Sequence, residues 1–507
     1  MNRRKAFSVS LSLAAVALTS CSGLPKGSSG GGGGGKSTVS FALVADTLPA
    51  NPSILSFRVS INGVQIKPTT GSALTLTPVT PVIDLMRLQS DTAFLGSLSQ
   101  VPAGSYTLQA SLANPILTFL NDTGSTLTAG STTCSSGSVC TAALTATGNP
   151  TIGSFTLTVA ASTNQGVELD FNLNSAISLS AGILSVTFSP ASPTPGVLSA
   201  FTLPRQNANL GSNQLELIED FTGVVSVSSN NVTLTSPARG ALTSANGSTS
   251  FFDPSPDGTL CQTPASFSCV VNGQVGSVDA FLNVDGSLSL KEYEPLTSTR
   301  QDLVEGTVYS ITPASGTQFG IVVTDRIEAA TGSLIGGLDV GDLLTVNIPS
   351  PKPFFVDTKG FPVSSFAPGT FGNFSGQTGT SAIHQGQSIL VHVTAFTAAS
   401  GTTIASATAD TVTLRWSRLS SSVQAASSPT FTIIGLPSYF GFAQGSLFGV
   451  QAFTGTAGGD GITNFDGIAA ANNLTPSTPP VELRALFLEN TTNSANPVFF
   501  AAKVRQH

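Results

Sequence analysis

The stretch Leu55-Ser56-Phe57-Arg58-Val59-Ser60-Ile61-Asn62-Gly63-Val64-Gln65-Ile66 indicates the fold class of the chain. Apolar side chains stand at every second position from Leu55 to Ile61, with polar side chains between them. A period of two is typical of a β-strand with one buried face. Asn62-Gly63 follows, a dipeptide typical of two-residue hairpin turns. We therefore predict a hairpin here, with a return strand that starts at Val64.

The same alternation recurs over the first 200 residues or so, in runs that begin at Tyr106, Phe155, Val167 and Leu184. Only Val82–Leu88 has a helical pattern, and it is short. Many short alternating strands separated by turns are typical of a β-sandwich. We therefore expect an all-β fold, with a sandwich over residues 37–196. Residues 189–196 carry three prolines, and we predict a linker that continues over 197–213.

The chain has 507 residues, of which 20 are Lys or Arg and 27 are Asp or Glu, for a net charge of −7. Charged residues make up 9% of the chain, where about 25% is usual. So few basic residues argue against nucleic-acid binding, which needs clustered contacts to phosphates. The hydrophobic content of 40% is sufficient for real cores. These numbers favour an exported, β-rich protein.

The N-terminus joins a short positive segment to a short apolar run that ends in a cysteine. Arg3-Arg4-Lys5 is a positive segment, and Ala6–Leu18 is an apolar run well short of the roughly 20 residues that span a bilayer. The run ends in Leu18-Thr19-Ser20-Cys21, which resembles a lipobox. The resemblance implies a signal peptide over 1–20 and a lipid on Cys21. The alternative is an ordinary signal peptide with a chance cysteine.

Residues 21–36 include six consecutive glycines, Gly30–Gly35, a composition typical of a flexible tether. We expect the protein to be lipid-anchored to a membrane of the bacterial cell envelope and to face the periplasm or the exterior. No later segment is apolar for long enough to cross a bilayer as a helix, so the lipid would be the membrane contact.

Four stretches characterise the sandwich segment: Val59-Ser60-Ile61-Asn62-Gly63-Val64, Ile83-Asp84-Leu85, Val101-Pro102-Ala103-Gly104-Ser105-Tyr106 and Val167-Glu168-Leu169-Asp170-Phe171-Asn172. Through them the segment resembles the β-rich domain of unknown function that follows the lipobox in bacterial lipoproteins. It implies a transthyretin-like or carbohydrate-binding-like sandwich and an envelope location. The family has no assigned activity, so the resemblance implies no reaction.

Three weak repeats follow, at 214–298, 299–418 and 419–507. The first two open on a Gly-x-Val strand, at Gly223 and Gly306, and each repeat closes on a similar strand. The pattern resembles the small OB-like domains of unknown function that repeat in bacterial secreted proteins. The third repeat lacks the opening glycine, so we expect two or three small barrels.

Four cysteines remain after Cys21, and an even number in an exported chain indicates disulfides. Four cysteines allow three connectivities. Local pairing of Cys134 with Cys140 and of Cys261 with Cys269 is favoured, because each pair lies in one loop rich in Ser, Thr or Pro. Zinc is the alternative, but the spacings do not fit and no histidine lies nearby.

Residues for catalysis are scarce. The three histidines are His384, His392 and His507, and none has a carboxylate at a motif spacing, so the sequence gives no support for a triad or a metalloenzyme. The segment 253–258 begins like a calcium loop but has Pro264 where the bidentate Glu belongs. A second group of oxygens lies at 460–466; Asx-turns in solvated loops are the favoured interpretation of both. We predict no catalytic residues, no metal and no cofactor.

Phenylalanine is abundant, at 31 residues against 1 Trp and 4 Tyr, which disfavours a stacking platform for sugars. Phe361, Phe366, Phe371 and Phe374 lie in a stretch rich in Gly, Ser and Pro, and they form either a partner surface or part of a core. We expect a non-catalytic binding or scaffolding protein whose partner is an envelope protein or a polysaccharide. The alternative is an extracytoplasmic hydrolase that acts on envelope polymers.

Overall fold

The computed structural model describes residues 35–506, except for 47–52, 80–81, 147, 151, 153–154, 189–195, 205–209, 238, 254–259, 262–264, 313–315, 367, 456–460, 477–479 and 490–496. All the described residues belong to one compact unit that begins at Gly35. The predicted signal peptide, Cys21 and all but the last two residues of the predicted tether lie outside them.

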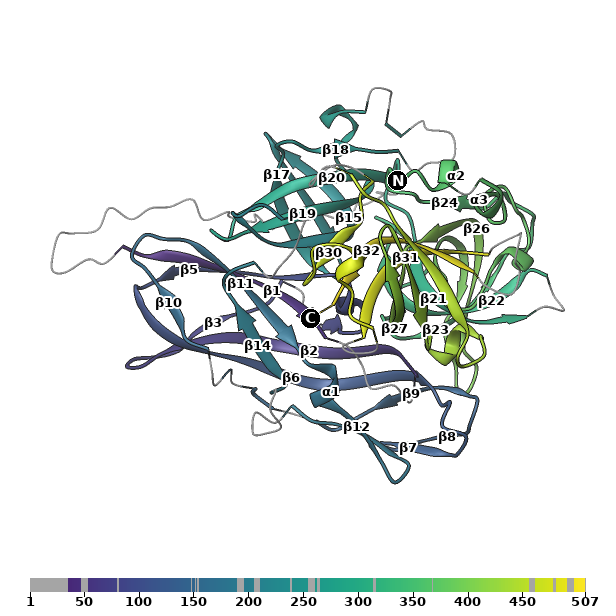
Figure 1. Cartoon of the computed structure of the whole chain (residues 1–507), viewed down its shortest axis with the longest axis horizontal. Helices are drawn as coiled ribbons and strands as arrows, with labels where there is room; N and C mark the ends of the chain where they lie inside the picture. Colours follow the sequence, from purple (N-terminus) through teal and green to yellow (C-terminus); the bar gives the residue numbers. More distant parts are fainter. Residues whose placement is uncertain are drawn as a thin grey trace, which may run out of the picture. The chain divides into compact units, whose positions relative to one another are not determined.

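The first part of the described chain folds into three sheets (Figure 1). The first sheet has the order β14-β11-β1-β5, and the second is built on β10-β6-β2-β3, with β4 against β2 and β9 against β6. A smaller third sheet has the order β12-β13-β7-β8. The strands are β1 Ser37–Ala45, β2 Ser53–Pro68, β3 Leu74–Leu76, β4 Val82–Asp84, β5 Ala93–Val101, β6 Gly104–Leu120, β7 Leu127–Ala129, β8 Thr132–Cys134, β9 Val139–Ala143, β10 Leu157–Val159, β11 Gln165–Phe171, β12 Ile177–Ser180, β13 Ile183–Val186 and β14 Leu198–Phe201.

The first two sheets share one hydrophobic core, as a sandwich requires. Phe41 and Leu169 of the first sheet and Phe57 and Leu108 of the second are buried in the same cluster. The rings of Phe57 and Phe171 meet edge to face, with centroids 6.3 Å apart. The alternating apolar side chains of the sequence therefore form the interior of the sandwich.

Two details differ from the sequence expectation. Asn62-Gly63 forms no hairpin turn, because β2 continues through it to Pro68. The register between β2 and β6 shifts between Ile61 and Gly63, so the dipeptide sits at an irregularity that keeps both strands paired. The expected linker 197–213 contains β14, which pairs antiparallel with β11 and extends the sandwich beyond residue 196.

The short helical pattern at Val82–Leu88 does not form one helix in the structure. Its first residues form β4, and the 3-10 helix η1 covers Arg87–Gln89. A four-residue helix, α1, covers Leu173–Ala176, and the Asn172 side chain caps it by accepting the backbone N–H of Ser175 at 2.8 Å.

The remaining described residues form three further sheets that share one strand order. If the five long strands of each sheet are numbered along the chain, the order is 3-2-1-4-5, and a strand of two or three residues pairs with the outer side of strand 5. We name them barrel 1 (214–297), barrel 2 (303–415) and barrel 3 (417–505). Their strands are β15 Gln214–Ser228, β16 Asn231–Ser236, β17 Gly240–Ala245, β18 Ser250–Phe251, β19 Val275–Asn283 and β20 Leu288–Thr297; β21 Leu303–Thr312, β22 Gln318–Ile327, β23 Leu343–Asn347, β24 Phe355–Val356, β25 Ser388–Thr397 and β26 Ala405–Arg415; β27 Ser417–Ser427, β28 Thr430–Ile434, β29 Leu447–Ala452, β30 Asn464–Asp466, β31 Val481–Leu488 and β32 Val498–Arg505.

Parallel pairing closes the sheets of barrels 2 and 3, which removes exposed sheet edges. In barrels 2 and 3 the third and fifth strands pair over four residues, β23 with β26 and β29 with β32. In barrel 1 the corresponding strands meet through one pair, Ala245 with Ser289. Short helices lie in the connections: η2 Phe267–Cys269, α2 Val363–Phe366, α3 Pro368–Gly372, η3 Thr380–Ala382, η4 Ser438–Phe440 and η5 Ala471–Asn473. The fold is thus an all-β sandwich followed by small OB-like barrels.

The registers allow the barrels to be aligned residue by residue. Phe221 pairs with Val278 in barrel 1, Val304 with Val391 in barrel 2, and Leu419 with Leu483 in barrel 3. All six side chains are buried. Barrel 3, which lacks the opening glycine, therefore repeats the strand order and the apolar positions of the other two.

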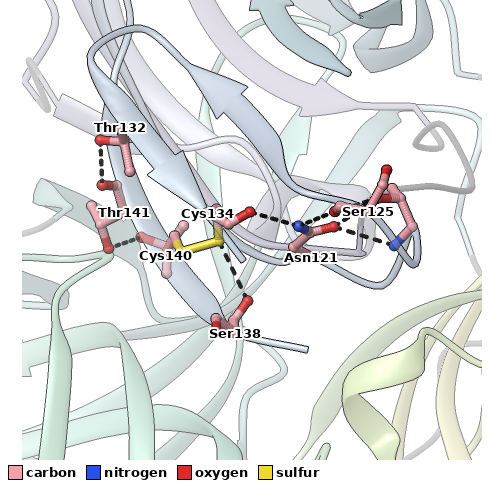
Figure 2. The surroundings of a disulfide bond; sticks show 9 residues. Asn121, Ser125, Thr132, Cys134, Ser138, Cys140 and Thr141 are labelled. Carbon is pink, nitrogen blue, oxygen red and sulfur yellow. Dashed lines mark hydrogen bonds between the residues drawn. A yellow bond between two sulfur atoms is a disulfide. The ribbon is translucent and has the colours of Figure 1, made fainter. Parts of the chain in front are cut away.

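Both favoured cysteine pairs are joined in the structure, Cys134 to Cys140 and Cys261 to Cys269. Figure 2 shows the first, which links β8 to β9 beside Asn121. The Asn121 side chain donates hydrogen bonds to the carbonyl oxygens of Cys134 and Ser125, both at 2.8 Å. The buried amide thus supports the same loop that the disulfide closes.

Candidate functional site

The most unusual feature of the structure is where its charges lie. Among the described residues, 22 Asp, Glu, Lys and Arg side chains are buried, against 20 + 27 = 47 charged residues in the whole chain. Charged side chains are almost never fully buried unless they are paired. Although the chain has few charged residues, many of them are buried and form an extensive network of ion pairs.

Lys359, in the loop after β24 of barrel 2, lies in the centre of this network. Its Nζ contacts Asp220 Oδ1 at 2.8 Å and Asp279 Oδ1 at 2.7 Å, both on barrel 1. Burial alone would lower the pKa of Lys359, but these two carboxylates outweigh it and hold the pKa well above its ordinary value. Lys359 therefore stays charged and joins barrel 2 to barrel 1.

Barrel 3 supplies further cations to the same acidic side chains. Arg484 on β31 donates through Nη1 to Glu219 Oε1 at 2.9 Å and through Nη2 to Asp220. Lys503 on β32 contacts Glu216 at 3.2 Å and Glu219 at 3.1 Å. Burial alone would raise the pKa of Asp220, but Arg484 and Lys359 hold it well below its usual range.

For some buried carboxyls, nearby cations and hydrogen bonds do not offset the cost of removing the charged form from water. Burial raises the pKa of Glu292 to about 8 and that of Glu294 to about 7. Burial also raises the pKa of Asp325 to about 7, although Arg87 lies near it. These three groups titrate in the neutral range, where ordinary carboxyls are fully ionised.

A half-open cavity of about 370 Å³ adjoins this network. The sandwich lines it with residues of β2, β4, β6 and the segment around η1, barrel 1 contributes residues around β15–β17, and barrel 2 contributes residues of β22 and the following loop. Its apolar residues are Val82, Ile83, Leu88, Ala93, Phe94, Ile116, Phe221, Pro237 and Val340. Ligand pockets are commonly mainly apolar clefts between domains, and this cavity has that form.

Four arginines line the same cavity: Arg58, Arg87, Arg239 and Arg326. Arg58 Nη1 contacts Asp339 Oδ2 at 3.1 Å, and Arg326 Nη2 lies 3.6 Å from Asp339 Oδ1. The Asp339 side chain is 58% exposed, whereas the two arginine side chains are 17% and 14% exposed. One exposed carboxylate therefore bridges arginines from the sandwich and from barrel 2.

Arg87 and Arg239 connect the cavity to the buried network. Arg87 Nε donates to Asp91 at 2.9 Å, and Arg239 Nε contacts Asp325 at 3.0 Å. Within the described ranges, the buried Nη2 of Arg87 has no hydrogen-bond partner. Burial raises the pKa of Asp84, which also lines the cavity and accepts backbone N–H groups through Oδ1.

The phenylalanines proposed as a partner surface do not share one environment. Phe374 is 1% exposed and belongs to the core of barrel 2, against which Phe361 and Phe371 are partly buried. Phe366 is 56% exposed. The structure thus places one of the four rings on the surface and the other three in or against the core.

The two described histidines each meet a carboxylate, and His507 lies outside the described residues. His384 Nε2 is 3.2 Å from Glu489 Oε2, and His392 Nδ1 is 2.7 Å from Asp410 Oδ1. Neither histidine lines the cavity described above. The structure therefore does not bring these histidines to the arginine cluster.

The two oxygen-rich loops lie partly outside the described residues, which omit 254–259 and Asp460. Asp466, from the second loop, is buried and accepts a hydrogen bond from Arg505 Nε at 2.6 Å. In the part of the chain that the structure describes, no three His, Cys, Asp or Glu side chains gather as a metal site would require. Nor does any helix there combine the length and the apolarity needed to cross a bilayer.

The sequence did not reveal the buried network or the cavity. The sequence signal of the network is a strand in which charged and apolar residues alternate, such as Val481-Glu482-Leu483-Arg484-Ala485. That pattern ordinarily indicates a strand with one face in solvent. Here both faces are buried, and Glu482 and Arg484 are 3% and 1% exposed.

No family model, curated protein or solved structure matches this chain.

Proposed function

We propose that the protein is a lipid-anchored component of the bacterial cell envelope that binds a small ligand and does not catalyse. The anchor is inferred from the positive segment, the apolar run and the lipobox-like Leu18-Thr19-Ser20-Cys21. The binding role is supported above all by the cavity of about 370 Å³ between the sandwich and barrels 1 and 2.

The buried ion pairs support a receptor-like role in a second way. Lys359 ties barrel 2 to barrel 1 through Asp220, and Arg87 of the sandwich lies 3.5 Å from Asp325 of barrel 2. The walls of the cavity are therefore held by contacts that do not depend on a ligand. A preformed cavity avoids the entropic cost of ordering its walls on binding. The network thus serves as a rigid frame for the site.

The anchor is tested by replacing the cysteine. Cys21→Ser is expected to prevent lipidation and to release the protein from membranes into the soluble fraction. The control is Ser20→Ala, a substitution at the neighbouring position that keeps Cys21. This variant should stay in the membrane pellet. Retention of Cys21→Ser in the pellet after a high-salt wash would contradict the anchor.

The binding role is tested with the purified chain from residue 37 onward, incubated with a solvent extract of bacterial envelopes and analysed by native mass spectrometry. Val82 lines the cavity and is 41% exposed, so Val82→Trp should obstruct it without disturbing a core. Val79 is 40% exposed and does not line the cavity, so Val79→Trp is the matched control. A small molecule retained by the wild type and by Val79→Trp but lost from Val82→Trp is expected. No retained molecule, or equal retention by all three, would count against the proposal.

An extracytoplasmic hydrolase is the second candidate. Asp84 and Asp91 both line the cavity, and paired carboxyls in different environments can act as acid and base. Asp91 is engaged by Arg87 and Arg418, at 2.9 and 2.8 Å. Hydrolysis of envelope polymers that disappears in Asp84→Asn would favour this role over simple binding.

A further inference from the structure

We propose that the cavity binds an anionic amphiphile, with its acidic head group on Arg58 and Arg326 in place of Asp339 and its alkyl chain along the apolar wall. This inference rests on the binding role proposed above and assigns the chemical class of the ligand.

The apolar wall accounts for one part of such a ligand. Val82, Ile83, Leu88 and Ile116 present aliphatic side chains to the cavity, and the rings of Phe94 and Phe221 complete the wall. The Val82 side chain is 41% exposed. Covering such a surface is favourable by about 25 cal/mol per Å², so a flexible alkyl chain is better suited to this wall than a sugar.

The charged wall accounts for the other part. The negative groups on the cavity are Asp84, Asp91 and Asp339. Asp84 Oδ1 accepts the backbone N–H groups of Phe57 and Met86, at 2.8 and 3.0 Å, and Asp91 is paired with Arg87 and Arg418. These two carboxyls are occupied by the protein.

Asp339 is the replaceable one. Its side chain is 58% exposed and touches Arg58 and Arg326, which come from different parts of the fold. Because the Asp339 carboxylate stays largely in solvent, its pairing with the two arginines is screened and weak, so a carboxylate that also buries an alkyl chain can displace it. Asp339 thus occupies the place of the ligand's acidic group. Two other acidic groups lie near Arg58 and Arg326: Glu328 pairs with Arg326, and Asp342 interacts electrostatically with both arginines. Asp325 pairs with Arg87 and Arg239, and none of these three carboxyls lines the cavity.

The test is isothermal titration calorimetry of the purified chain from residue 37 onward with octanoate, octyl phosphate, octan-1-ol and octyltrimethylammonium. We expect the two anions to bind at least tenfold more tightly than the alcohol, and the cation not to bind. The two anions together distinguish a carboxylate from a phosphate head group. From hexanoate to decanoate, affinity should rise about fourfold per added methylene, because each buried methylene contributes about 0.8 kcal/mol.

Two variants with opposite expected effects make the assignment specific. Asp339→Asn removes the competing carboxylate and should tighten octanoate binding several-fold, whereas Arg58→Met should weaken it at least tenfold. Asp285 is an acidic residue outside the cavity, so Asp285→Asn controls for net charge and should leave the affinity unchanged.

Equal affinities for octanoate and octan-1-ol, or no gain in Asp339→Asn, would overturn the assignment. If no anion binds while an envelope molecule is still lost from Val82→Trp, the ligand class is wrong and the binding role stands. If no anion binds and no envelope molecule is lost from Val82→Trp, both the ligand class and the binding role are wrong.

Discussion

Arg418 on β27 and Asp220 on β15 occupy the same position in two barrels of identical strand order, carry opposite charges, and contact each other at 3.6 Å. Each directly precedes the aligned apolar residue of its first strand, Leu419 or Phe221. On the fourth strand Asp279 aligns with Arg484 in the same way. On the fifth strand the partners opposite these two residues are Glu292 and Lys503.

This inversion makes barrels 1 and 3 electrostatically complementary. Barrel 2 has Leu303, His392 and Thr411 at the three aligned positions, and its cation Lys359 comes from a loop instead. Buried ion pairs are weak evidence for stability, because desolvation offsets much of their attraction. Removing one partner, however, leaves an uncompensated buried charge.

The first prediction concerns Lys359. Lys359→Met should destabilise the protein by about 3–5 kcal/mol, because Asp279 would remain buried without the cation that it contacts and Asp220 would lose one of its cations. Lys291 is a partly exposed lysine that contacts Glu292 at 3.8 Å, and Lys291→Met should cost about 0–1 kcal/mol. Chemical denaturation measures both. Equal effects of the two substitutions would show that the network is not held by Lys359.

The second prediction is a fall in stability with rising pH. Burial raises the pKa of Glu292 from 4.5 to about 8, so the folded state holds a proton that the unfolded chain has already released. A group of this kind lowers stability by about 1.4 kcal/mol per pH unit between its two pKa values. Glu294 and Asp325, each raised to about 7, act in the same direction.

At the acid end the sign reverses. The pKa of Asp220 and that of Asp279 are lowered, so their contribution is present above their ordinary pKa of 3.8 and is lost as the pH falls through the folded-state value. Thermal unfolding should therefore show greatest stability near about pH 5. Glu292→Gln should flatten the decline between pH 5 and 8. An unchanged slope in that variant would exclude Glu292 as a source.

The third prediction separates two neighbouring phenylalanines. Phe374→Ala should lower the free energy of unfolding by about 3–5 kcal/mol, because its ring is 1% exposed in the core of barrel 2. Phe366→Ala should change it by less than about 1 kcal/mol, since that ring is 56% exposed. A comparable loss from both would mean that Phe366 is also part of the core.

The fourth prediction concerns the disulfides, which close loops with sequence separations of 6 and 8 residues. Replacing either pair by serine should cost about 2–2.5 kcal/mol on the chain-entropy account. Non-reduced peptide mapping should recover only the links Cys134–Cys140 and Cys261–Cys269. A peptide that joins Cys140 to Cys261 would refute the local pairing.

Local patterns predicted much of the fold because strand formation and loop closure depend on near neighbours. Alternating residues such as Phe57 and Val59 indicated the sandwich, and cysteines in one loop indicated local disulfides. Asn62-Gly63 misled because a turn dipeptide is also compatible with a bulge when two long strands remain paired around it.

By itself, the sequence determined the all-β class, the repeated strand pattern and the local cysteine pairs, since each follows from periodicity or spacing of about ten residues or fewer. Only the tertiary structure decided which charged faces are buried. Arg484 and Asp220 are separated by 264 residues, and no local pattern indicates that they meet. The cavity has the same origin: Arg58, Arg239 and Arg326 converge because three sheets pack together, and packing between distant segments is not encoded in any one of them.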